Sequence, residues 1–155
     1  MGTNSKLNFN WILINELAVG ALPKTFEDID FLKEEGVDCI LSLCDKNEGD
    51  LPENLNKFFF CERFVLPDHT SERIPTIEEI NKSLVILKNL LKKGAVYVHC
   101  YAGVERSPLL CMAYLICYKN IDRQTALEYM MQTHPKTNPL KGQLELLDDL
   151  KNVNY

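Results

Sequence analysis

The sequence predicts an α/β fold, with a central, mostly parallel sheet flanked by helices on both faces. Short apolar runs of strand length alternate with segments of helical periodicity, as in parallel sheets with helical crossovers. The central runs are apolar almost throughout, as expected for strands that are buried on both faces. The 155 residues suffice for one sizeable core, and we expect a single domain over residues 1–155.

The predicted strands form a short N-terminal pair followed by core strands. The pair is joined near Asn15 and Glu16, and the later strands are expected to be buried. The polar segment 44–56, which contains Gly49 and Pro52, is expected to form a loop or a short helix. The predicted strands are residues 11–14, 17–22, 37–43, 58–66 and 95–99.

Capping residues indicate where the predicted helices begin and end. Thr25 with Asp28, and Thr76 with Glu79, have the spacing of capping boxes, and Gly36 is placed to end the first helix. The segment before Lys119 is apolar on nearly all sides, so this helix should be buried. The predicted helices are residues 26–35, 77–92, 108–118, 126–131 and 140–150.

Charge and cysteine content narrow the function classes. A formal net charge of -5 argues against a surface that wraps nucleic acid. No apolar run approaches the roughly 20 residues that span a membrane, and the N-terminus lacks the apolar core of a signal peptide. None of the six cysteines forms a C-x-x-C pair, and the three histidines do not cluster with them at zinc spacing. We expect a cytoplasmic monomer that binds no metal, nucleic acid or membrane.

A short loop joins the last predicted strand to the buried helix. The backbone N–H groups of such a turn can converge into an anion-binding nest. Gly103 permits a curled backbone, and Arg106 offers a planar fork for a phosphoryl group. Ser107 precedes Pro108 and is expected to cap the helix. The expected substrate-binding residues are Tyr101, Ala102, Gly103, Val104, Glu105 and Arg106.

Cys100 lies at the base of this predicted nest. Donors that hold a phosphate also stabilise a thiolate, and helix N-termini and nearby cations make cysteines more acidic than ordinary thiols. A thiolate beneath a phosphate-sized nest can attack phosphorus in line and form a covalent intermediate. The sequence therefore indicates nucleophilic phosphoryl transfer, for which no metal is needed because the thiolate is already an activated nucleophile.

The run His99-Cys100-x5-Arg106-Ser107 resembles the signature of the cysteine-dependent protein tyrosine phosphatases, and most of all their compact dual-specificity branch. The resemblance extends over nearly the whole chain. It implies a phosphatase-type strand, phosphate loop and helix, and hydrolysis of phosphate esters without a cofactor. The other matching segments are WILINELAVGALP, GVDCILSLCD, LPDHTSERIPTIEEINKSL and AYLICYKNIDRQTALEYMMQTHP.

The resemblance implies catalytic roles for the signature residues. Cys100 would be the nucleophile, and Arg106 would clamp the phosphoryl oxygens and stabilise the transition state. A surface ion pair with Glu105 or Asp68 is the alternative for Arg106. Ser107 would hydrogen-bond the thiolate and improve it as a leaving group, a role compatible with helix capping.

A general acid is expected on the loop after the fourth predicted strand. Asp68 follows that strand at the sheet edge where the nest opens, and its separation from Cys100 is close to that usual in the compact branch. The alternative for Asp68 is a plain turn residue. His69 and Glu72 are weaker candidates for the acid.

Supporting roles are expected for His99 and Cys44. His99 should orient the loop by donating to backbone carbonyls, in preference to acting as a general base. Cys44 ends a core strand at the edge where the nest lies, and in some relatives a cysteine there traps the oxidised nucleophile as a disulfide. We therefore expect either such a redox partner of Cys100 or a packed thiol. The remaining cysteines, which include Cys61, Cys111 and Cys117, are expected mostly in the core.

The loop composition favours a phosphorylated protein as the substrate. Its interior has no lysine and one acid, Glu105, and negative charge near the pocket repels polyanions such as phosphoinositides and RNA 5′-phosphates. This argument fails if Glu105 points away and pairs elsewhere. Because the short chain lacks the elements that deepen a tyrosine-only pocket, phosphoserine and phosphothreonine are expected beside phosphotyrosine.

Two other function classes remain open. The domain could be a phospho-residue binding module that has lost turnover, although such relatives usually lack one of the residues Cys100, Arg106 and Asp68, which are all present here. Sulfur transfer on a rhodanese-like scaffold also uses a cysteine in a nest-shaped loop. The interval between Cys100 and Arg106, with an aspartate upstream, fits phosphoryl transfer better.

Overall fold

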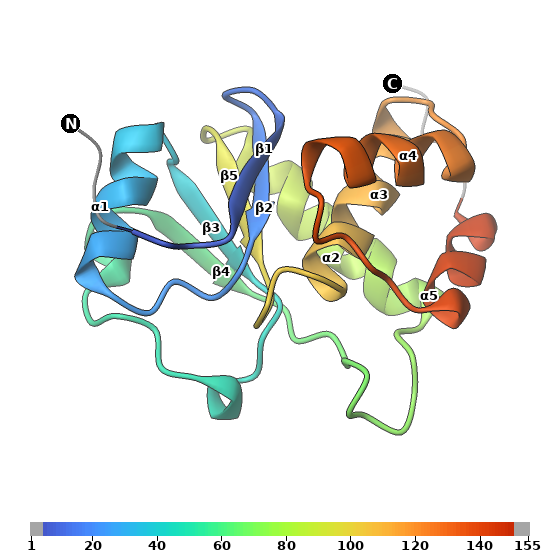
Figure 1. The fold of residues 1–155 in the computed structure, drawn as a ribbon, viewed down its shortest axis with the longest axis horizontal. Coiled ribbons are helices and arrows are strands. Elements are labelled where there is room, and N and C mark those ends of the chain that lie inside the picture. Colours follow the sequence, from blue (N-terminus) through green and yellow to red (C-terminus); the bar gives the residue numbers. More distant parts are fainter. Residues whose placement is uncertain (1–4, 151–155) are drawn as a thin grey trace.

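The computed structural model describes residues 5–150, which contain a five-stranded sheet in the order β1-β2-β5-β3-β4 (Figure 1). β1 and β2 are antiparallel, whereas the neighbours from β2 to β4 are all parallel. The predicted α/β fold with a mostly parallel sheet is therefore confirmed. The strands are β1 (Phe9–Leu13), β2 (Leu17–Gly20), β3 (Cys39–Ser42), β4 (Phe60–Arg63) and β5 (Val96–His99).

Helices cover both faces of the sheet (Figure 1). Side chains alternate along the central strand β5, so Tyr97 joins a core cluster with α1, while Val96 and Val98 join the cluster on the opposite face. α1 lies on the first face alone, and the other helices lie on the second. They are α1 (Phe26–Glu35), α2 (Ile77–Leu91), α3 (Arg106–Tyr118), α4 (Arg123–Thr133) and α5 (Lys141–Leu146).

The predicted capping boxes are present. Thr25 Oγ1 accepts from Asp28 N at 3.1 Å, and the Asp28 carboxylate accepts from Thr25 N at 3.2 Å. Thr76 and Glu79 make the same pair of bonds at the start of α2. Gly36 follows α1 in the left-handed region, at φ 89°. The sequence therefore defines the start of both helices, and α3 is buried along most of its length, as predicted.

β4 differs from the prediction of a buried strand over residues 58–66. It spans only Phe60–Arg63, lies at the edge of the sheet and is largely exposed. Phe58 and Phe60 are 52% and 54% exposed, and Cys61, which was expected in the core, is exposed as well. Lysine ammonium groups lie 3.3 and 4.8 Å from the centroids of the two phenyl rings. The apolar run indicated a strand correctly but not its burial, because cation–π contacts cover these rings outside the core.

Other differences concern the ends of elements. α3 begins at Arg106 rather than Pro108, so Ser107 lies inside the helix and is not its cap. α4 begins before residue 126 because Asp122 caps it, accepting from Thr125 N at 2.8 Å. The segment 44–56 contains short helical turns, one of its two predicted alternatives. These 3-10 turns are η1 (Lys46–Glu48) and η2 (Leu55–Lys57), and a third, η3 (Leu147–Asp149), follows α5.

The parallel strands β5, β3 and β4 end at a common edge, where the loops that follow them meet (Figure 1). This edge contains the candidate site. The predicted ends of the domain, residues 1–4 and 151–155, lie outside the described residues. Within residues 5–150, no helix has both the length and the apolar character needed to cross a membrane.

Candidate active site

The loop between β5 and α3 is held from outside through its carbonyl groups. Across a trans peptide, the carbonyl and the following N–H point in opposite directions. Since the carbonyls of residues 101–104 bond outwards, the N–H groups of residues 102–105 are directed inwards, above Cys100, as a nest for an anion. The outer bonds run from Leu22 N to Tyr101 O (3.1 Å), Asn8 Nδ2 to Ala102 O (3.0 Å), His134 Nε2 to Gly103 O (2.5 Å) and Asn138 N to Val104 O (2.7 Å).

Gly103 is required in this loop for two reasons. Its φ of 73° lies in the left-handed region that side chains disfavour. A Cβ here would also lie 2.5 Å from the carbonyl carbon of Gly20 and 2.8 Å from the nitrogen of Ala21. The close approach of the loop to the end of β2 therefore depends on glycine at this position, as the sequence predicted.

Cys100 is buried at the base of the nest, next to Ser107. Its Sγ lies 3.2 Å from Ser107 Oγ, which is also 3.1 Å from the carbonyl oxygen of Gly20. The serine hydroxyl has one proton, so it can donate to Gly20 while the thiol is protonated, or rotate to donate to a thiolate. Ser107 is thus placed to stabilise the charged form of Cys100, although the structure rejects its predicted capping role.

Arg106 is buried with its guanidinium fixed on one side. Nη1 donates to the backbone oxygens of Leu43 (3.2 Å) and Leu66 (3.1 Å), and both terminal nitrogens bond the Glu48 carboxylate, at 3.0 and 2.5 Å. Among the described residues no acceptor is bound to Nε, so the edge formed by Nε and Nη2 is open to a phosphoryl group. Burial alone would lower the pKa of Arg106, but the bonds to Glu48 and the nearby thiols raise it above its usual value.

Glu48 is a site residue that the sequence analysis missed. It lies at the end of η1, where its carboxylate also accepts from Asp45 N at 2.7 Å in a capping box. Burial alone would raise the pKa of Glu48, but the hydrogen bonds from Arg106 and from Asp45 N, together with the charge of Arg106, outweigh it and the pKa is lowered. The spacing of Asp45 and Glu48, directly after a core strand that ends at the nest, is the signal that could have revealed it.

Asp68 lies on the loop after β4 and lines the same cavity as Cys100. Its Oδ1 accepts from Thr70 Oγ1 at 2.6 Å and from Thr70 N at 3.0 Å, and its Oδ2 lies 3.7 Å from Arg106 Nη2. The hydrogen bonds from Thr70 lower the pKa of Asp68, and the positive charge of Arg106 lowers it further. Asp68 is also a turn residue, since its backbone oxygen accepts from Ser71 N. The two alternatives for Asp68 are therefore compatible.

The other acidic candidates have different positions. His69 lines the cavity, and its Nδ1 lies 3.0 Å from Glu105 Oε2, whereas Glu72 lines a separate surface hollow. Glu105 also accepts from Gln143 Nε2 at 2.6 Å, and its side chain is only 12% exposed. Glu105 therefore pairs with His69 and Gln143, which is the condition under which the charge argument against polyanionic substrates fails. It is not the ion-pair partner of Arg106, which binds Glu48 instead.

His99 and Cys44 both lie behind the nest. Burial lowers the pKa of His99 to about 4, so the ring is neutral near pH 7, and Nδ1 lies 3.3 Å from the backbone oxygen of Cys100. Burial raises the pKa of the Cys44 thiol to about 12, although the charge of Arg106 acts in the opposite direction. Cys44 is thus held as a neutral thiol near the nucleophile candidate.

The cavity above Cys100 has a volume of about 670 Å³. It collects groups from three loops, since the segments after β3, β4 and β5 contribute Glu48, Asp68 and the nest. Of the predicted substrate-binding residues, Tyr101, Ala102, Val104, Glu105 and Arg106 line it. Among residues 5–150, no group of three or more His, Cys, Asp or Glu side chains could hold a metal ion.

A buried cysteine beneath an anion nest at the end of a parallel strand, facing a clamped arginine, defines a cysteine-dependent phosphoester hydrolase. The chain belongs to the family described as dual specificity phosphatase, catalytic domain, whose model matches residues 22–152. The fold supports this membership. PTPMT1, solved in complex with PI(5)P, superimposes with a TM-score of 0.79 at 23% identity, over 92% of this chain and 94% of that one. A human tyrosine phosphatase-like serine/threonine/tyrosine-interacting protein gives a TM-score of 0.76 at 22% identity, over 91% and 93% of the two chains.

Curated relatives fall into two groups. Phosphatidylglycerophosphate phosphatase PTPMT2 of Arabidopsis thaliana is 29% identical over 145 residues, which is 92% of this chain and 63% of that protein. PTPMT1 of the same plant is 28% identical over 77% of this chain and 36% of its own length. Dual specificity protein phosphatase 5 of Rattus norvegicus is 48% identical over 49 residues, 32% of this chain and 13% of that protein. The chain thus spans less than two thirds of the length of each of these relatives.

Proposed function

We propose that the protein removes the phosphomonoester group from a glycerophospholipid headgroup through a cysteinyl-phosphate intermediate. The observation that carries this substrate class is the extent of similarity: the match to phosphatidylglycerophosphate phosphatase PTPMT2 covers 92% of this chain, whereas that to dual specificity protein phosphatase 5 covers 32%. The engagement of Glu105 by His69 and Gln143 supports it, because the acid then repels a lipid phosphate less. This substrate differs from the phosphoprotein that the loop composition favoured.

The rim of the cavity suits an acylated substrate. Tyr101 and Leu140 are 46% and 40% exposed, and Val104 is a further apolar residue of the lining. The nest and Arg106 supply donors for a single phosphate group at the bottom of the cavity. An amphiphile can therefore place its phosphate in the nest and its apolar part against the rim.

In the first chemical step, the Cys100 thiolate attacks phosphorus and a sulfur–phosphorus bond forms as the bond to the leaving oxygen breaks. The charge that develops on the phosphoryl oxygens is met by the inward N–H groups and by the open edge of Arg106. Asp68, in its protonated form, donates its proton to the leaving alkoxide.

In the second step, water attacks the cysteinyl phosphate. The Asp68 carboxylate takes a proton from the water, the sulfur–phosphorus bond breaks, and inorganic phosphate forms. The departing thiolate accepts a hydrogen bond from Ser107, whose hydroxyl lies 3.2 Å away and needs only to turn from Gly20. Ser107 thereby acts at the step that regenerates the enzyme.

The protonation of Asp68 depends on the substrate. In the free site Thr70 and Arg106 lower its pKa, which favours the carboxylate. A phosphate dianion that enters the nest takes up the charge of Arg106 and adds negative charge beside the carboxylate, and both changes raise the pKa of Asp68. The acid is thus expected to gain its proton together with the substrate.

A phosphorylated protein is the second candidate substrate. The 48% identity to dual specificity protein phosphatase 5 over 49 residues favours it. The open mouth of the cavity is compatible with a phosphorylated side chain. A cytoplasmic location and a monomeric state stay predictions from the sequence.

The test is phosphate release from three substrates, with Cys100→Ser as the control: short-chain phosphatidylglycerophosphate, a peptide with phosphotyrosine or phosphothreonine, and p-nitrophenyl phosphate. We expect kcat/KM for the lipid to exceed that for the peptides by about tenfold or more, and all turnover to vanish in the variant. The reverse ranking would assign the phosphoprotein substrate. If the wild type binds phosphopeptides but turns over none of the three, the protein is a binding module.

A further inference from the structure

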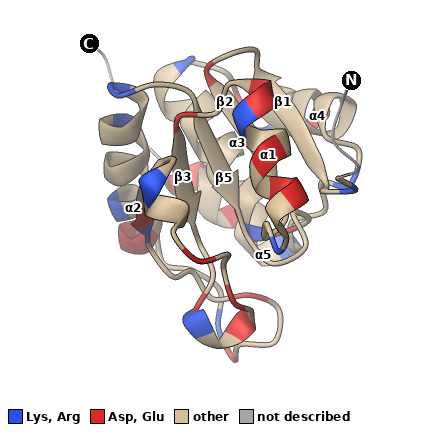
Figure 2. Cartoon of the chain, turned by 90° about the vertical axis from the view of Figure 1, so that its left-hand side faces the viewer, with Lys and Arg blue, Asp and Glu red and all other residues tan. Residues whose placement is uncertain are grey.

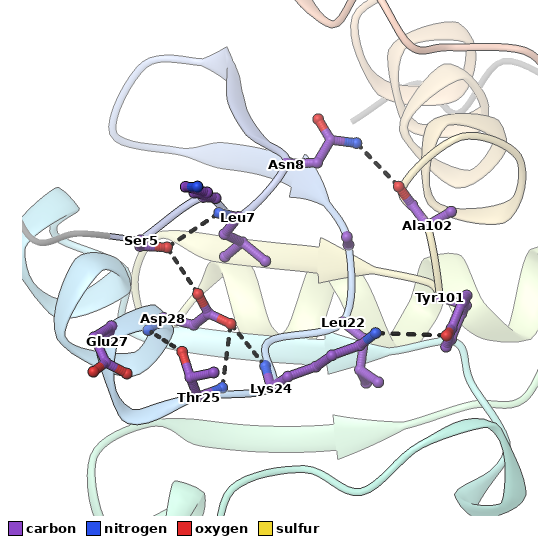
Figure 3. Close-up of a pocket in the computed structure, with 12 residues that line it drawn as sticks. Ser5, Leu7, Asn8, Leu22, Lys24, Thr25, Glu27, Asp28, Tyr101 and Ala102 are labelled. Carbon is purple, nitrogen blue, oxygen red and sulfur yellow. Dashed lines mark hydrogen bonds between the residues drawn. The ribbon is translucent and has the colours of Figure 1, made fainter.

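A second cavity lies beside the nest (Figure 3). Its volume is about 580 Å³, and it is formed between the segment before β1, the segment before α1 and the start of the nest. Tyr101 and Ala102 line both cavities. The two cavities therefore adjoin at the first residues after Cys100.

Lys24 places a positive charge at the shared wall. Its Nζ lies 4.7 Å from the centroid of the Tyr101 ring and 3.5 Å from the Tyr101 hydroxyl, and in Figure 3 the side chain stretches from the segment before α1 to this ring. Within residues 5–150, no carboxylate lies within ion-pair distance of Lys24. The ammonium is exposed and can therefore donate to a ligand.

Two lysines, Lys6 and Lys24, line this cavity together with two acids, and Lys24 contacts Tyr101 at the wall shared with the nest. Asp28 is already bonded by Ser5 Oγ (2.8 Å), Lys24 N (2.8 Å) and Thr25 N (3.2 Å), so the start of α1 is closed by its own caps. Glu27 lies at the end of the cavity far from Tyr101 (Figure 3). α1 is otherwise mostly acidic on its outer side (Figure 2), so recognition of an anion here must come from the local lysines, Lys24 and Lys6, rather than from a broad basic surface.

We propose that this second cavity binds a second anionic group of the substrate, the phosphodiester that lies one glycerol unit away from the phosphomonoester in the nest. The proposal rests on the proposed function for its substrate, and it assigns Lys24 as the residue that distinguishes such a headgroup from a simple phosphate ester. Tyr101 lines both cavities and contacts Lys24 at its ring and hydroxyl, so a ligand with two anions on a short linker can lie along this side chain.

Substrate selectivity provides the first test. Lys24→Gln is compared with the wild type on short-chain phosphatidylglycerophosphate, on short-chain phosphatidic acid, which lacks the phosphodiester, and on p-nitrophenyl phosphate. Loss of one charge-assisted contact should lower kcat/KM about tenfold on the first substrate and change the other two less than about twofold. Lys82→Gln, a lysine on α2 that pairs only with Glu78 in the described structure, serves as the matched control. Equal loss on all three substrates, or no loss on the first, would overturn the proposal.

Inhibition provides a second test that does not depend on the natural substrate. Trimethylene bisphosphonate, which has two anions on a short linker, and propylphosphonate, which has one, are compared as competitive inhibitors of p-nitrophenyl phosphate hydrolysis. The bisphosphonate should bind about tenfold more tightly to the wild type, and this advantage should disappear in Lys24→Gln. If the advantage is absent or survives the substitution, the subsite is wrong, whichever lipid or peptide the enzyme hydrolyses. If it disappears while phosphatidylglycerophosphate is not hydrolysed, the subsite stands and the proposed substrate fails.

Discussion

Two loops meet above Cys100, and they are stabilised in different ways. The nest that follows β5 is bonded from outside by Leu22, Asn8, His134 and Asn138, which come from segments far apart in the sequence. Within residues 5–150, Asp68 on the loop after β4 is held only by Thr70 and Ser71 of the same loop, apart from the contact of 3.7 Å with Arg106. In Figure 1 this second loop extends away from the sheet before it reaches α2.

Because the two loops are supported differently, phosphate binding and proton donation depend on different sets of contacts. The groups that bind the phosphoryl group are fixed by the fold before a substrate enters, which is the condition for electrostatic stabilisation of a transition state. The proton donor rests on local contacts and adjusts its charge to the substrate. Substitutions in the nest should therefore weaken the binding of every phosphate, whereas substitutions in the acid loop should affect only substrates with poor leaving groups.

The largest effect is expected for Arg106→Lys. A lysine keeps the charge but loses the planar fork, so it can neither bond Glu48 with two nitrogens nor present an edge to the phosphate. We expect kcat/KM for p-nitrophenyl phosphate to fall by about 10³-fold. Arg123→Lys, which changes an arginine paired with Asp148 on the surface, is the control and should leave turnover unchanged. A loss below tenfold would show that a point charge suffices.

Asp68→Asn is expected to have the next largest effect, and the effect should depend on the leaving group. Turnover of an alkyl phosphate should fall by about 10²-fold, while that of p-nitrophenyl phosphate, whose leaving group needs little protonation, should fall far less. Glu72→Gln, a neighbouring acid outside the cavity, should change neither. Equal losses on both esters would contradict the assignment of Asp68 as general acid.

The pH dependence sharpens this test. Because Asp68 has a lowered pKa in the free protein, kcat/KM for the alkyl ester should be highest where the carboxyl group is still protonated and should fall as pH rises. In Asp68→Asn this limb should be absent. A profile of kcat/KM that keeps the same falling limb in the variant would mean that another group donates the proton.

The sequence determined the nest better than the groups around it. The succession of strands and helices along the chain, the capped helices and the loop from Cys100 to Arg106 follow from local signals: apolar runs alternating with helical periodicity, capping boxes, and a glycine that precedes an arginine. Glu48 was not predicted, because its role arises only when the ends of β3 and β5 lie side by side. The predicted burial of β4 was wrong for a similar reason, since the position of a strand at the edge or the centre is a property of the sheet order and not of the strand itself.

Glu48→Gln should reduce activity less than the changes above. The amide keeps the size of the side chain but removes the charge and one of the two acceptor oxygens, so the guanidinium edge is held less firmly towards the phosphate. We expect a fall in kcat/KM of about tenfold for p-nitrophenyl phosphate. Glu79→Gln is a closely matched control, because Glu79 also belongs to a capping box and binds an arginine, Arg73, through two nitrogens, but does so on the surface. Similar activity of the two variants would mean that Glu48 has only a structural role.

Lowering the pH should destabilise the wild type in the same way as Glu48→Gln does, because both remove the negative charge of Glu48. Glu48 has a folded-state pKa below its usual value, so its pairing stabilises the protein above the unfolded pKa, and this contribution is lost as pH falls through the folded pKa. Thermal unfolding of the wild type and of Glu48→Gln should therefore differ most near neutral pH and converge in acid. A difference in melting temperature that is constant from neutral to acidic pH would rule out ionised Glu48 as its source.

The smallest effect is expected at the outer support of the nest. His134 Nε2 lies 2.5 Å from Gly103 O, and its Nδ1 lies 2.6 Å from the Asn10 side chain, so the ring links the loop to β1. Burial lowers the pKa of His134, and a hydrogen bond donated to Gly103 O requires that Nε2 carries the ring proton. His134→Ala removes one of four outer bonds and should weaken competitive inhibition by inorganic phosphate about fivefold.

His134→Gln retains an N–H donor and should restore part of the affinity, while the ratio of alkyl to aryl ester turnover should stay at its wild-type value in both variants. If His134→Ala changes that ratio but not phosphate affinity, the nest and the acid loop are coupled, and the separation between fixed phosphate binding and adjustable proton donation fails.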